Sequence, residues 1–307
     1  MPLLTPERRA RDALLSSATA RWDALAERRP ELGPAVDLQR QLLGIVLKAT
    51  EALEGAKLPR LSLPPKYLCA KLGRGVPFLA GEPIPVPVAL LRKTLLELCE
   101  ALVTGAATEA ADHIREALTS GRVDAASLLT ASLARDQEAV RSGAAHQGLA
   151  PDLTWLVGEL ACGPFAHVLK RALLASPDEA LAAAADNWSG GYCLLCGSWP
   201  AVAEVVHGRR ALRCSFCALA WELKAYHCIY CGEAGVPFVT AAPDEERKDR
   251  RLELCAQCGA YLKTVDVDAL SPFPLVAIAD METMDLDVAA MEHGYGRPPL
   301  KDFTVKR

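Results

Sequence analysis

The chain has 307 residues, of which 51% are hydrophobic and 23% are charged, and its formal net charge is −4. This composition indicates a globular protein of one large or two ordinary domains, and the small net charge argues against a basic nucleic-acid-binding surface. The first fifteen residues lack the apolar run of a signal peptide, and no apolar stretch is long enough to predict a membrane span. We therefore expect a cytoplasmic protein, in which cysteines stay reduced and paired cysteines bind metal more often than they form disulfides.

Apolar residues that recur at spacings of three and four predict a helical domain over residues 1–188. Thr5, Pro6 and Glu7 are typical of a helix start, and this first helix is expected to end near Arg28. The proline-rich segment 60–87 predicts an ordered loop or a set of short turns. The remaining helices are expected over residues 35–55, from 86 to about 102, and over 108–119, 123–142, 151–175 and 177–187.

The pattern changes near Ser189-Gly190-Gly191, after which short apolar runs predict brief strands. These strands are expected at residues 201–206, 210–213, 220–224 and 261–265. The charged run 240–251 predicts a solvated hairpin tip or loop, and residues 276–293 predict a C-terminal helix. The expected fold class is α+β, mostly α, with a helical bundle followed by tandem rubredoxin-like or zinc-ribbon modules. The predicted domains are 1–188, a first metal module at 189–226, a second at 227–270, and a C-terminal helix and tail at 271–307.

Eight of the eleven cysteines lie between residues 193 and 258, and all eight form Cys-x-x-Cys pairs. Two such pairs that face each other can hold one metal ion in tetrahedral geometry, as zinc and iron both allow. Pairing in sequence order is the economical assignment, although interleaved pairing and a redox dithiol are alternatives. The predicted metal ligands are Cys193, Cys196, Cys214 and Cys217 for one ion, and Cys228, Cys231, Cys255 and Cys258 for the other.

The residue after each pair supports this interpretation. Gly197, Gly232 and Gly259 follow three of the pairs, at a place where the backbone often needs a positive φ, whereas Ala218 follows the fourth. Four protein ligands close the coordination shell of each ion, so neither site is expected to catalyse a reaction. We predict no catalytic and no organic cofactor-binding residues.

The other cysteines and the histidines favour structural roles. Cys69, Cys99 and Cys162 lie among apolar neighbours and are expected to be small core residues, and Cys162-Gly163-Pro164-Phe165 has no catalytic context. No ligand spacing connects the six histidines, and His227, although it adjoins Cys228, is expected at the surface. The histidines are His113, His146, His167, His207, His227 and His293.

Five stretches carry a family resemblance, namely YCLLCGSWPAVAEV, LRCSFCALAW, CIYCGE, LELCAQCGAYLKTVDV and PLVAIADMETMDLDVAAMEHGYGR. They resemble the formate dehydrogenase accessory protein (FdhE) family, and all eight paired cysteines match the motif positions of that family. The stretch between Cys196 and Cys214 is short for the family, which leaves the strand lengths there open. The tail also reads Ala-Asp-Met-Glu where the family pattern has a second Asp.

The resemblance implies a non-enzymatic maturation factor. It implies two metal ions, iron rather than zinc, and contact with the catalytic subunit of formate dehydrogenase, and with its signal segment, before export. A rubredoxin-like electron-transfer role is an alternative. A zinc ribbon that binds nucleic acid is disfavoured, because residues 189–265 hold nine basic and eight acidic residues. No nucleic acid and no membrane span is therefore predicted, and homo-oligomerisation is left open.

The tail contains an acidic cluster with two interpretations. Acids near a helix N-terminus complement the helix dipole, which is the simpler one. The alternative is a docking face for an arginine-bearing segment of the partner. The cluster consists of Asp280, Glu282, Asp285 and Asp287.

Overall fold

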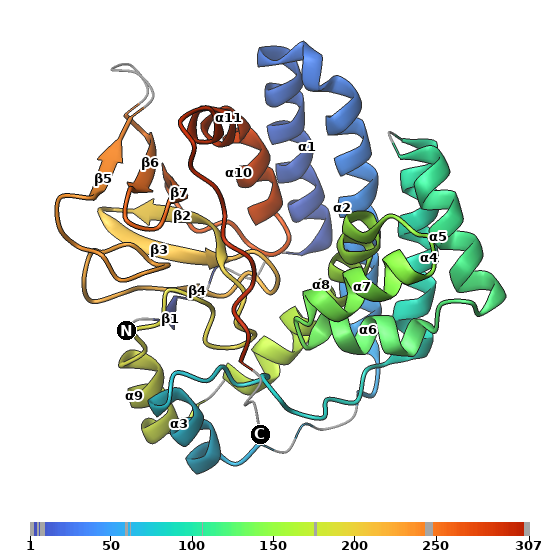
Figure 1. Cartoon of the computed structure of the whole chain (residues 1–307), viewed down its shortest axis with the longest axis horizontal. Coiled ribbons are helices and arrows are strands. Elements are labelled where there is room, and N and C mark those ends of the chain that lie inside the picture. The colour runs from blue at the N-terminus through green and yellow to red at the C-terminus, as the bar shows by residue number, and fades with distance from the viewer. Residues whose placement is uncertain are drawn as a thin grey trace. The chain divides into compact units, whose positions relative to one another are not determined.

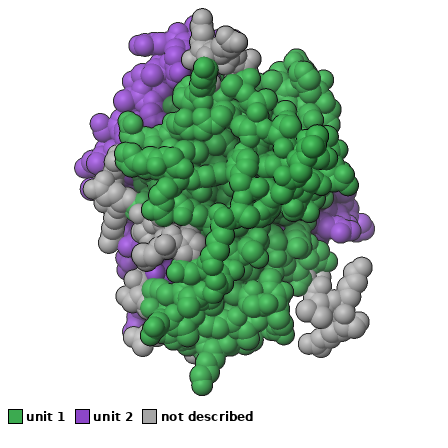
Figure 2. Space-filling model, turned by 90° about the vertical axis from the view of Figure 1, so that its left-hand side faces the viewer, with its two compact units in different colours: residues 1–9, 63–80, 176–307 green, residues 10–62, 81–175 purple. Residues whose placement is uncertain are grey.

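The computed structural model describes residues 3–4, 6, 10–58, 61, 63–105, 107–174, 177–242 and 248–303. The chain divides into two compact units, which Figure 2 colours separately. The helical unit comprises residues 10–62 and 81–175, and the cysteine unit comprises residues 1–9, 63–80 and 176–307. The segment 63–80 thus belongs to the unit that carries the cysteines. The domain boundaries at 188, 226 and 270 stay predictions.

The helical unit is a bundle in which α8 packs against α2, α4, α6 and α7 (Figure 1). The α4 helix shows the reason for the packing: Leu91, Leu95 and Leu98 recur at three and four residues, and all three are fully buried. The elements of this unit are α1 (Arg11–Arg28), η1 (Pro30–Leu32), α2 (Gly33–Gly55), α4 (Val88–Thr104), α5 (Thr108–Ser120), α6 (Ala125–Leu133), α7 (Gln137–His146) and α8 (Pro151–Leu174).

Two helix predictions need correction in this unit. The helix expected over 123–142 is two helices, because Arg135 takes a positive φ of 62° and Asp136 then caps α7 by accepting a hydrogen bond from the backbone of Ala139. The first helix begins at Arg11 rather than in the Thr5 region, and Ala10 provides no side-chain cap. Thr5 and Glu7 themselves lie outside the described residues.

The cysteine unit contains a helix that the sequence analysis missed. The α3 helix (Pro65–Gly73) lies inside the segment expected to form loops and turns, and it packs against α9 (Glu179–Asp186). Pro65 is the first residue of α3, where a proline costs no hydrogen bond because the N–H there has no helical partner. The prolines of this segment therefore start a helix as well as ending one.

A seven-stranded sheet forms the centre of the cysteine unit, in the order β1-β4-β3-β2-β7-β6-β5 (Figure 1). Neighbouring strands are antiparallel, except that β2 and β7 run parallel. The strands are β1 (Leu3–Leu4), β2 (Pro200–Val206), β3 (Arg209–Cys214), β4 (Ala220–Trp221), β5 (Phe238–Ala241), β6 (Arg250–Cys255) and β7 (Ala260–Asp266). The charged run 240–251, expected to be a hairpin tip or loop, connects the antiparallel strands β5 and β6, and its first two and last two residues belong to these strands. Residues 243–247 lie outside the described residues.

The parallel pairing of β2 with β7 joins the two cysteine modules into this one sheet. Beside the junction, the side chains of Glu204 and Arg213 form an ion pair at 0% exposure, and Ser271 contributes its N–H to Glu204 and its carbonyl to Arg213. The predicted α+β, mostly α, fold class is confirmed. No helix within the described residues is long and apolar enough to cross a membrane.

The C-terminal helix is broken in two. The α10 helix (Val276–Glu282) ends at Thr283, whose hydroxyl donates to the carbonyl of Ala279, and α11 (Met284–Glu292) follows at once. The first of these helices packs against β2, and the second packs against β6 and β7.

Candidate metal centres

The first four cysteines converge at the ends of β2 and β3. The distance from Cys193 Sγ to Cys217 Sγ is 3.7 Å, and Cys196 Sγ lies 3.5 Å from Cys214 Sγ. Metal–sulfur bonds of about 2.3 Å in a tetrahedron place the sulfurs about 3.8 Å apart, whereas a disulfide requires about 2.05 Å. The spacing therefore fits four thiolates around one ion and not a pair of disulfides.

The second four cysteines repeat this geometry in the second module. The Sγ atoms of Cys228 and Cys258 are 3.7 Å apart, and those of Cys231 and Cys255 are 3.6 Å apart. In each cluster the four sulfurs all lie within 4.8 Å of one another. The structure thus brings together the same two sets of four that pairing in sequence order predicts, and the donor set suits zinc or iron.

Each Cys-x-x-Cys pair forms the same tight turn. The N–H of Gly197 donates to the carbonyl of Cys193 at 2.8 Å, and Gly232 and Gly259 repeat this bond in the second module. All three glycines have positive φ, as does Ala218 at 53°. The alanine therefore takes the conformation that glycine favours elsewhere. In its turn, the N–H groups of Phe216 and Cys217 both point at Cys214 Sγ from 3.4 Å.

The two clusters differ most in exposure. All four cysteines of the first cluster are buried, and burial raises the pKa of the Cys193 and Cys217 thiols well above the ordinary value. In the second cluster Cys231 and Cys258 are exposed, although burial still raises the pKa of Cys258 to about 11. The same ligand set is therefore enclosed in one module and open to solvent in the other.

The segment 75–79, which follows α3, encloses the first cluster. The N–H groups of Phe78 and Leu79 donate to the carbonyls of Leu194 and Leu195, which lie between two ligands, at 2.8 and 2.9 Å. Phe78 and Leu79 are 0% and 3% exposed. Tyr192, next to the first ligand, donates its hydroxyl to the carbonyl of residue 75 at 2.7 Å. The proline-rich segment thus covers a metal centre.

The C-terminal segment covers the same turn from another direction. The ring of Phe303 lies against Gly197, so closely that a Cβ at residue 197 would approach it to 2.5 Å, and its centroid is 4.8 Å from that of Tyr192. Trp199 donates its indole N–H to the carbonyl of Pro299 at 2.8 Å. The end of the described chain is therefore part of the first centre's enclosure.

Aromatic rings connect the two centres. Tyr192 precedes the first ligand, Tyr230 lies between Cys228 and Cys231, and Trp199 lies between these tyrosines in space. The ring centroids are 5.8 Å apart for Tyr192 and Trp199, and 4.8 Å apart for Trp199 and Tyr230. The modules therefore share packing at their ligand turns as well as one sheet.

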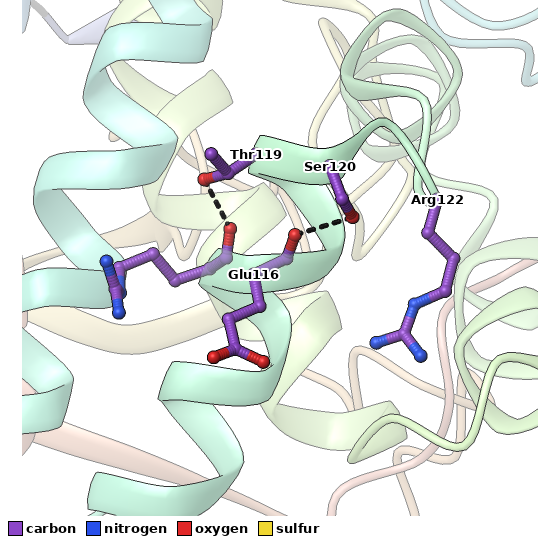
Figure 3. Close-up of a pocket in the computed structure, with 5 residues that line it drawn as sticks. Glu116, Thr119, Ser120 and Arg122 are labelled. Atoms are coloured by element: carbon purple, nitrogen blue, oxygen red, sulfur yellow. Dashed lines mark hydrogen bonds between the residues drawn. The ribbon is translucent and has the colours of Figure 1, made fainter.

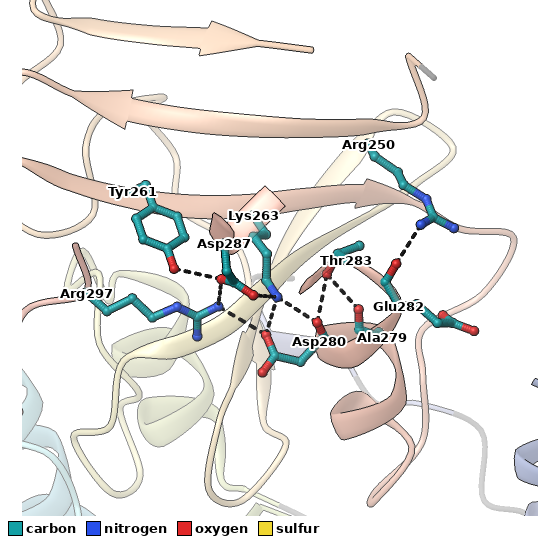
Figure 4. Close-up of polar contacts among 9 residues, drawn as sticks. All are labelled: Arg250, Tyr261, Lys263, Ala279, Asp280, Glu282, Thr283, Asp287 and Arg297. Atoms are coloured by element: carbon teal, nitrogen blue, oxygen red, sulfur yellow. Dashed lines mark hydrogen bonds and ion pairs between the residues drawn. The ribbon is translucent and has the colours of Figure 1, made fainter. Parts of the chain in front are cut away.

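The acidic cluster of the tail faces inward at two positions (Figure 4). The fully buried Lys263 Nζ lies 2.6 Å from a carboxylate oxygen of Asp280 and 2.6 Å from one of Asp287. Arg297 contacts the same two carboxylates at 3.1 and 3.0 Å. Burial opposes ionisation of Asp280, but the charges of Lys263 and Arg297 outweigh it and hold its pKa below the ordinary value. These two acids tie the C-terminal helices to β7, which is a different role from complementing a dipole.

Two of the three other cysteines, Cys99 and Cys162, lie in the core, whereas Cys69, also expected to be a core residue, is only half-buried. Burial raises the pKa of the Cys99 and Cys162 thiols to about 12, and Cys162 donates to the carbonyl of Leu129, as expected for small core residues. Figure 3 shows a surface pocket at the end of α5, lined by residues 115, 116, 119, 120 and 122. Its hydroxyls, on Thr119 and Ser120, donate to carbonyls of their own helix. This pocket offers no activated nucleophile.

Comparisons with known proteins agree with the cysteine motifs. No family model matches the chain. Over 117 residues the chain is 28% identical to a protein FdhE homolog of Aquifex aeolicus, and over 116 residues it is 30% identical to protein FdhE of Escherichia coli O127:H6 and 34% identical to a homolog of Edwardsiella ictaluri. Each match covers 36% of this chain and only 37–40% of the relative.

The fold comparison extends over nearly the whole chain. The crystal structure of the FdhE protein from Pseudomonas aeruginosa matches with a TM-score of 0.61, at 22% identity, over 97% of each chain. The resemblance to the FdhE family is confirmed. The short stretch from Cys196 to Cys214, one of the two expected departures from the FdhE pattern, still holds the strands β2 and β3.

Proposed function

We propose that this protein is a non-enzymatic accessory factor for formate dehydrogenase, with one metal ion in each four-cysteine cluster. The observation that carries the proposal is the pair of four-cysteine clusters, each with its sulfurs within 4.8 Å of one another, in a fold shared with an FdhE protein. Four thiolates fill the coordination shell, so the ions would stabilise structure or carry electrons rather than bind substrate. The family resemblance favours iron over zinc in both clusters, and the eight paired cysteines would be the ligands.

The proposed partner is the catalytic subunit of formate dehydrogenase, met in the cytoplasm. The support is the likeness to FdhE proteins in the cysteine region and in fold. Asp280 and Asp287 are poor candidates for binding an arginine-bearing signal segment, because Lys263 and Arg297 already engage both carboxylates. A contact with the signal segment would therefore not use these two carboxylates.

Two measurements test this function. Anaerobically purified protein should contain two metal ions per chain, with the red colour of ferric four-thiolate iron rather than colourless zinc. A pull-down with the metal-loaded protein should recover the catalytic subunit of formate dehydrogenase, and protein stripped of metal serves as the matched control. Absence of the subunit from the loaded pull-down would contradict the accessory role, whatever the metal content.

Electron transfer is a second candidate, favoured by the aromatic rings between the centres. Tyr192, Trp199 and Tyr230 connect one ligand turn to the other through ring contacts of 5.8 and 4.8 Å. A redox protein would show a reversible couple in its iron form, and replacement of Trp199 by leucine would slow electron exchange between the centres. Redox-silent zinc in freshly isolated protein would end this candidate.

A further inference from the structure

The second centre is open at both of its ligand turns. Beyond the exposed ligands Cys231 and Cys258, the turn residues Ala256, Gln257 and Gly259 are exposed, as is Gly232. In the first centre, by contrast, every residue from 191 to 198 is buried, and so is every residue from 214 to 217 except Ser215. Two ligand residues of the second centre are thus exposed to solvent, whereas none of the first centre is.

The two remaining ligands of the second centre are held by backbone hydrogen bonds, one of them within a strand. Cys255 ends β6 and pairs with Phe238 on one side and Ala260 on the other. Cys228 donates its N–H to the carbonyl of Glu233 at 2.8 Å, and it is 3% exposed. The centre therefore combines two anchored ligands with two accessible ones.

We propose that the second centre is a metal-exchange site, at which Cys231 and Cys258 hand the ion to thiolates of another molecule while the first centre keeps its ion. The proposal rests on the proposed function, because it requires both clusters to hold metal. The molecule that receives the ion is an acceptor with thiol ligands, either a small free thiol or a protein with cysteines.

The exchange step is a ligand substitution that involves no electron transfer. An incoming thiol loses its proton and its sulfur bonds to the ion, while the bond from the ion to Cys258 Sγ breaks. Cys258 takes up a proton and leaves as a neutral thiol, so the number of thiolates on the ion is unchanged. Cys228 and Cys255 keep the ion in place during the step, because strand pairing and the tight turn hold them.

The same step is blocked at the first centre by packing. At the Cys193–Cys196 turn, an incoming sulfur would have to displace the backbone of residues 78 and 79, which is hydrogen-bonded between the two ligands, or the ring of Phe303. At the other turn, Cys214 and Cys217 are themselves buried. Interiors packed in this way yield only through local unfolding. The ion of the first centre is therefore expected to leave only as fast as its module opens by local unfolding.

The test follows metal release from the full-length, zinc-loaded chain. Native mass spectrometry counts the ions after addition of glutathione in one arm, and of a metal-free four-cysteine peptide in the other. We expect two phases, in which the ion of the second centre leaves about tenfold faster or more than the ion of the first centre. Faster release to the peptide than to glutathione at equal thiol concentration would identify a protein acceptor, and the reverse order would identify a small thiol.

Alkylation with iodoacetamide during the fast phase assigns that phase to a centre. Cys231 and Cys258 should be modified first, and the cysteines of the first centre should stay protected until the ion of the first centre leaves. Gln257→Ala, at an exposed residue beside Cys258 that is not a ligand, is the matched control and should leave both rates unchanged. Replacement of Cys258 by serine should remove the fast phase and leave the slow one.

The outcomes separate this inference from the function on which it rests. Fewer than two ions at the start would contradict the metal content of the proposed function. Loss of both ions at the same rate, or loss of the ion of the first centre before that of the second, would overturn the exchange site while the accessory role stands.

Discussion

The two cysteine clusters have the same ligand spacing and the same turns, yet one is enclosed and the other is open. The local geometry is shared because each Cys-x-x-Cys pair builds its own turn, with a positive φ at the following residue. The enclosure differs because only the first cluster receives the segment 75–79 and Phe303. Ligand spacing thus sets the four-sulfur geometry, and distant parts of the chain determine what can reach it.

The largest predicted difference between the clusters follows from removing one ligand from each. Cys214→Ser should abolish cooperative unfolding of the cysteine unit, because binding of a structural zinc supplies about 10–16 kcal/mol of folding free energy in small zinc modules. Cys258→Ser should leave the protein folded with one ion less, since its centre is anchored by strands. Circular dichroism melting and metal content check both variants, and equal loss of stability would contradict the comparison.

Sequence reasoning found the two sets of four cysteines and the class of fold because their signals are local. The pairs, the glycines that follow them and the helical periodicity of residues such as Leu91 and Leu95 all act within a few positions. The α3 helix was missed because Pro65 was interpreted as part of a loop, although a first helical turn accepts proline. The β6 strand was missed because it begins within the charged run 240–251, although its Glu253 is 3% exposed and pairs with Arg210.

The enclosure of the first cluster could not be predicted from the sequence. The hydrogen bond from Tyr192 to the carbonyl of residue 75 joins positions 117 residues apart, and the contact of Phe303 with Gly197 is also distant in the chain. No local pattern marks such pairs. The same holds for the acidic tail, in which Asp280 and Asp287 are explained by their contacts with the buried Lys263 and with Arg297.

The next prediction concerns the buried ion pair beside the first cluster. Glu204→Gln should lower the free energy of unfolding by about 3–5 kcal/mol, because Arg213 would keep an uncompensated charge at 0% exposure. Glu222→Gln, which breaks the exposed pair with Arg209, is the control and should cost less than about 1 kcal/mol. Urea unfolding measures both. A small effect at Glu204 would mean that water reaches the first module.

A smaller effect is expected from opening the first cluster at its edge. Phe303→Ala removes a partly buried ring from Gly197 and should cost about 1–2 kcal/mol of stability. It should also make Cys196 reactive toward iodoacetamide under conditions in which the parent protein is protected. Tyr226→Ala, at an exposed ring of the second module, is the control. If Cys196 stays protected, the segment 75–79 is sufficient to enclose the first centre without Phe303.

The smallest predicted effect compares the residues that follow two of the pairs. Gly232→Ala should destabilise the protein by about 1 kcal/mol, because its φ of 82° strains an alanine although nothing lies within 4 Å of the new Cβ. Ala218→Gly relieves a similar strain at φ 53°, but it removes a buried methyl group worth about 0.8 kcal/mol and frees the unfolded chain by about 0.5–1 kcal/mol. These contributions oppose each other, so Ala218→Gly should change stability by less than about 1 kcal/mol. A clear gain in melting temperature for Ala218→Gly would show that packing around this turn contributes little, and that the first centre is enclosed less tightly than its burial indicates.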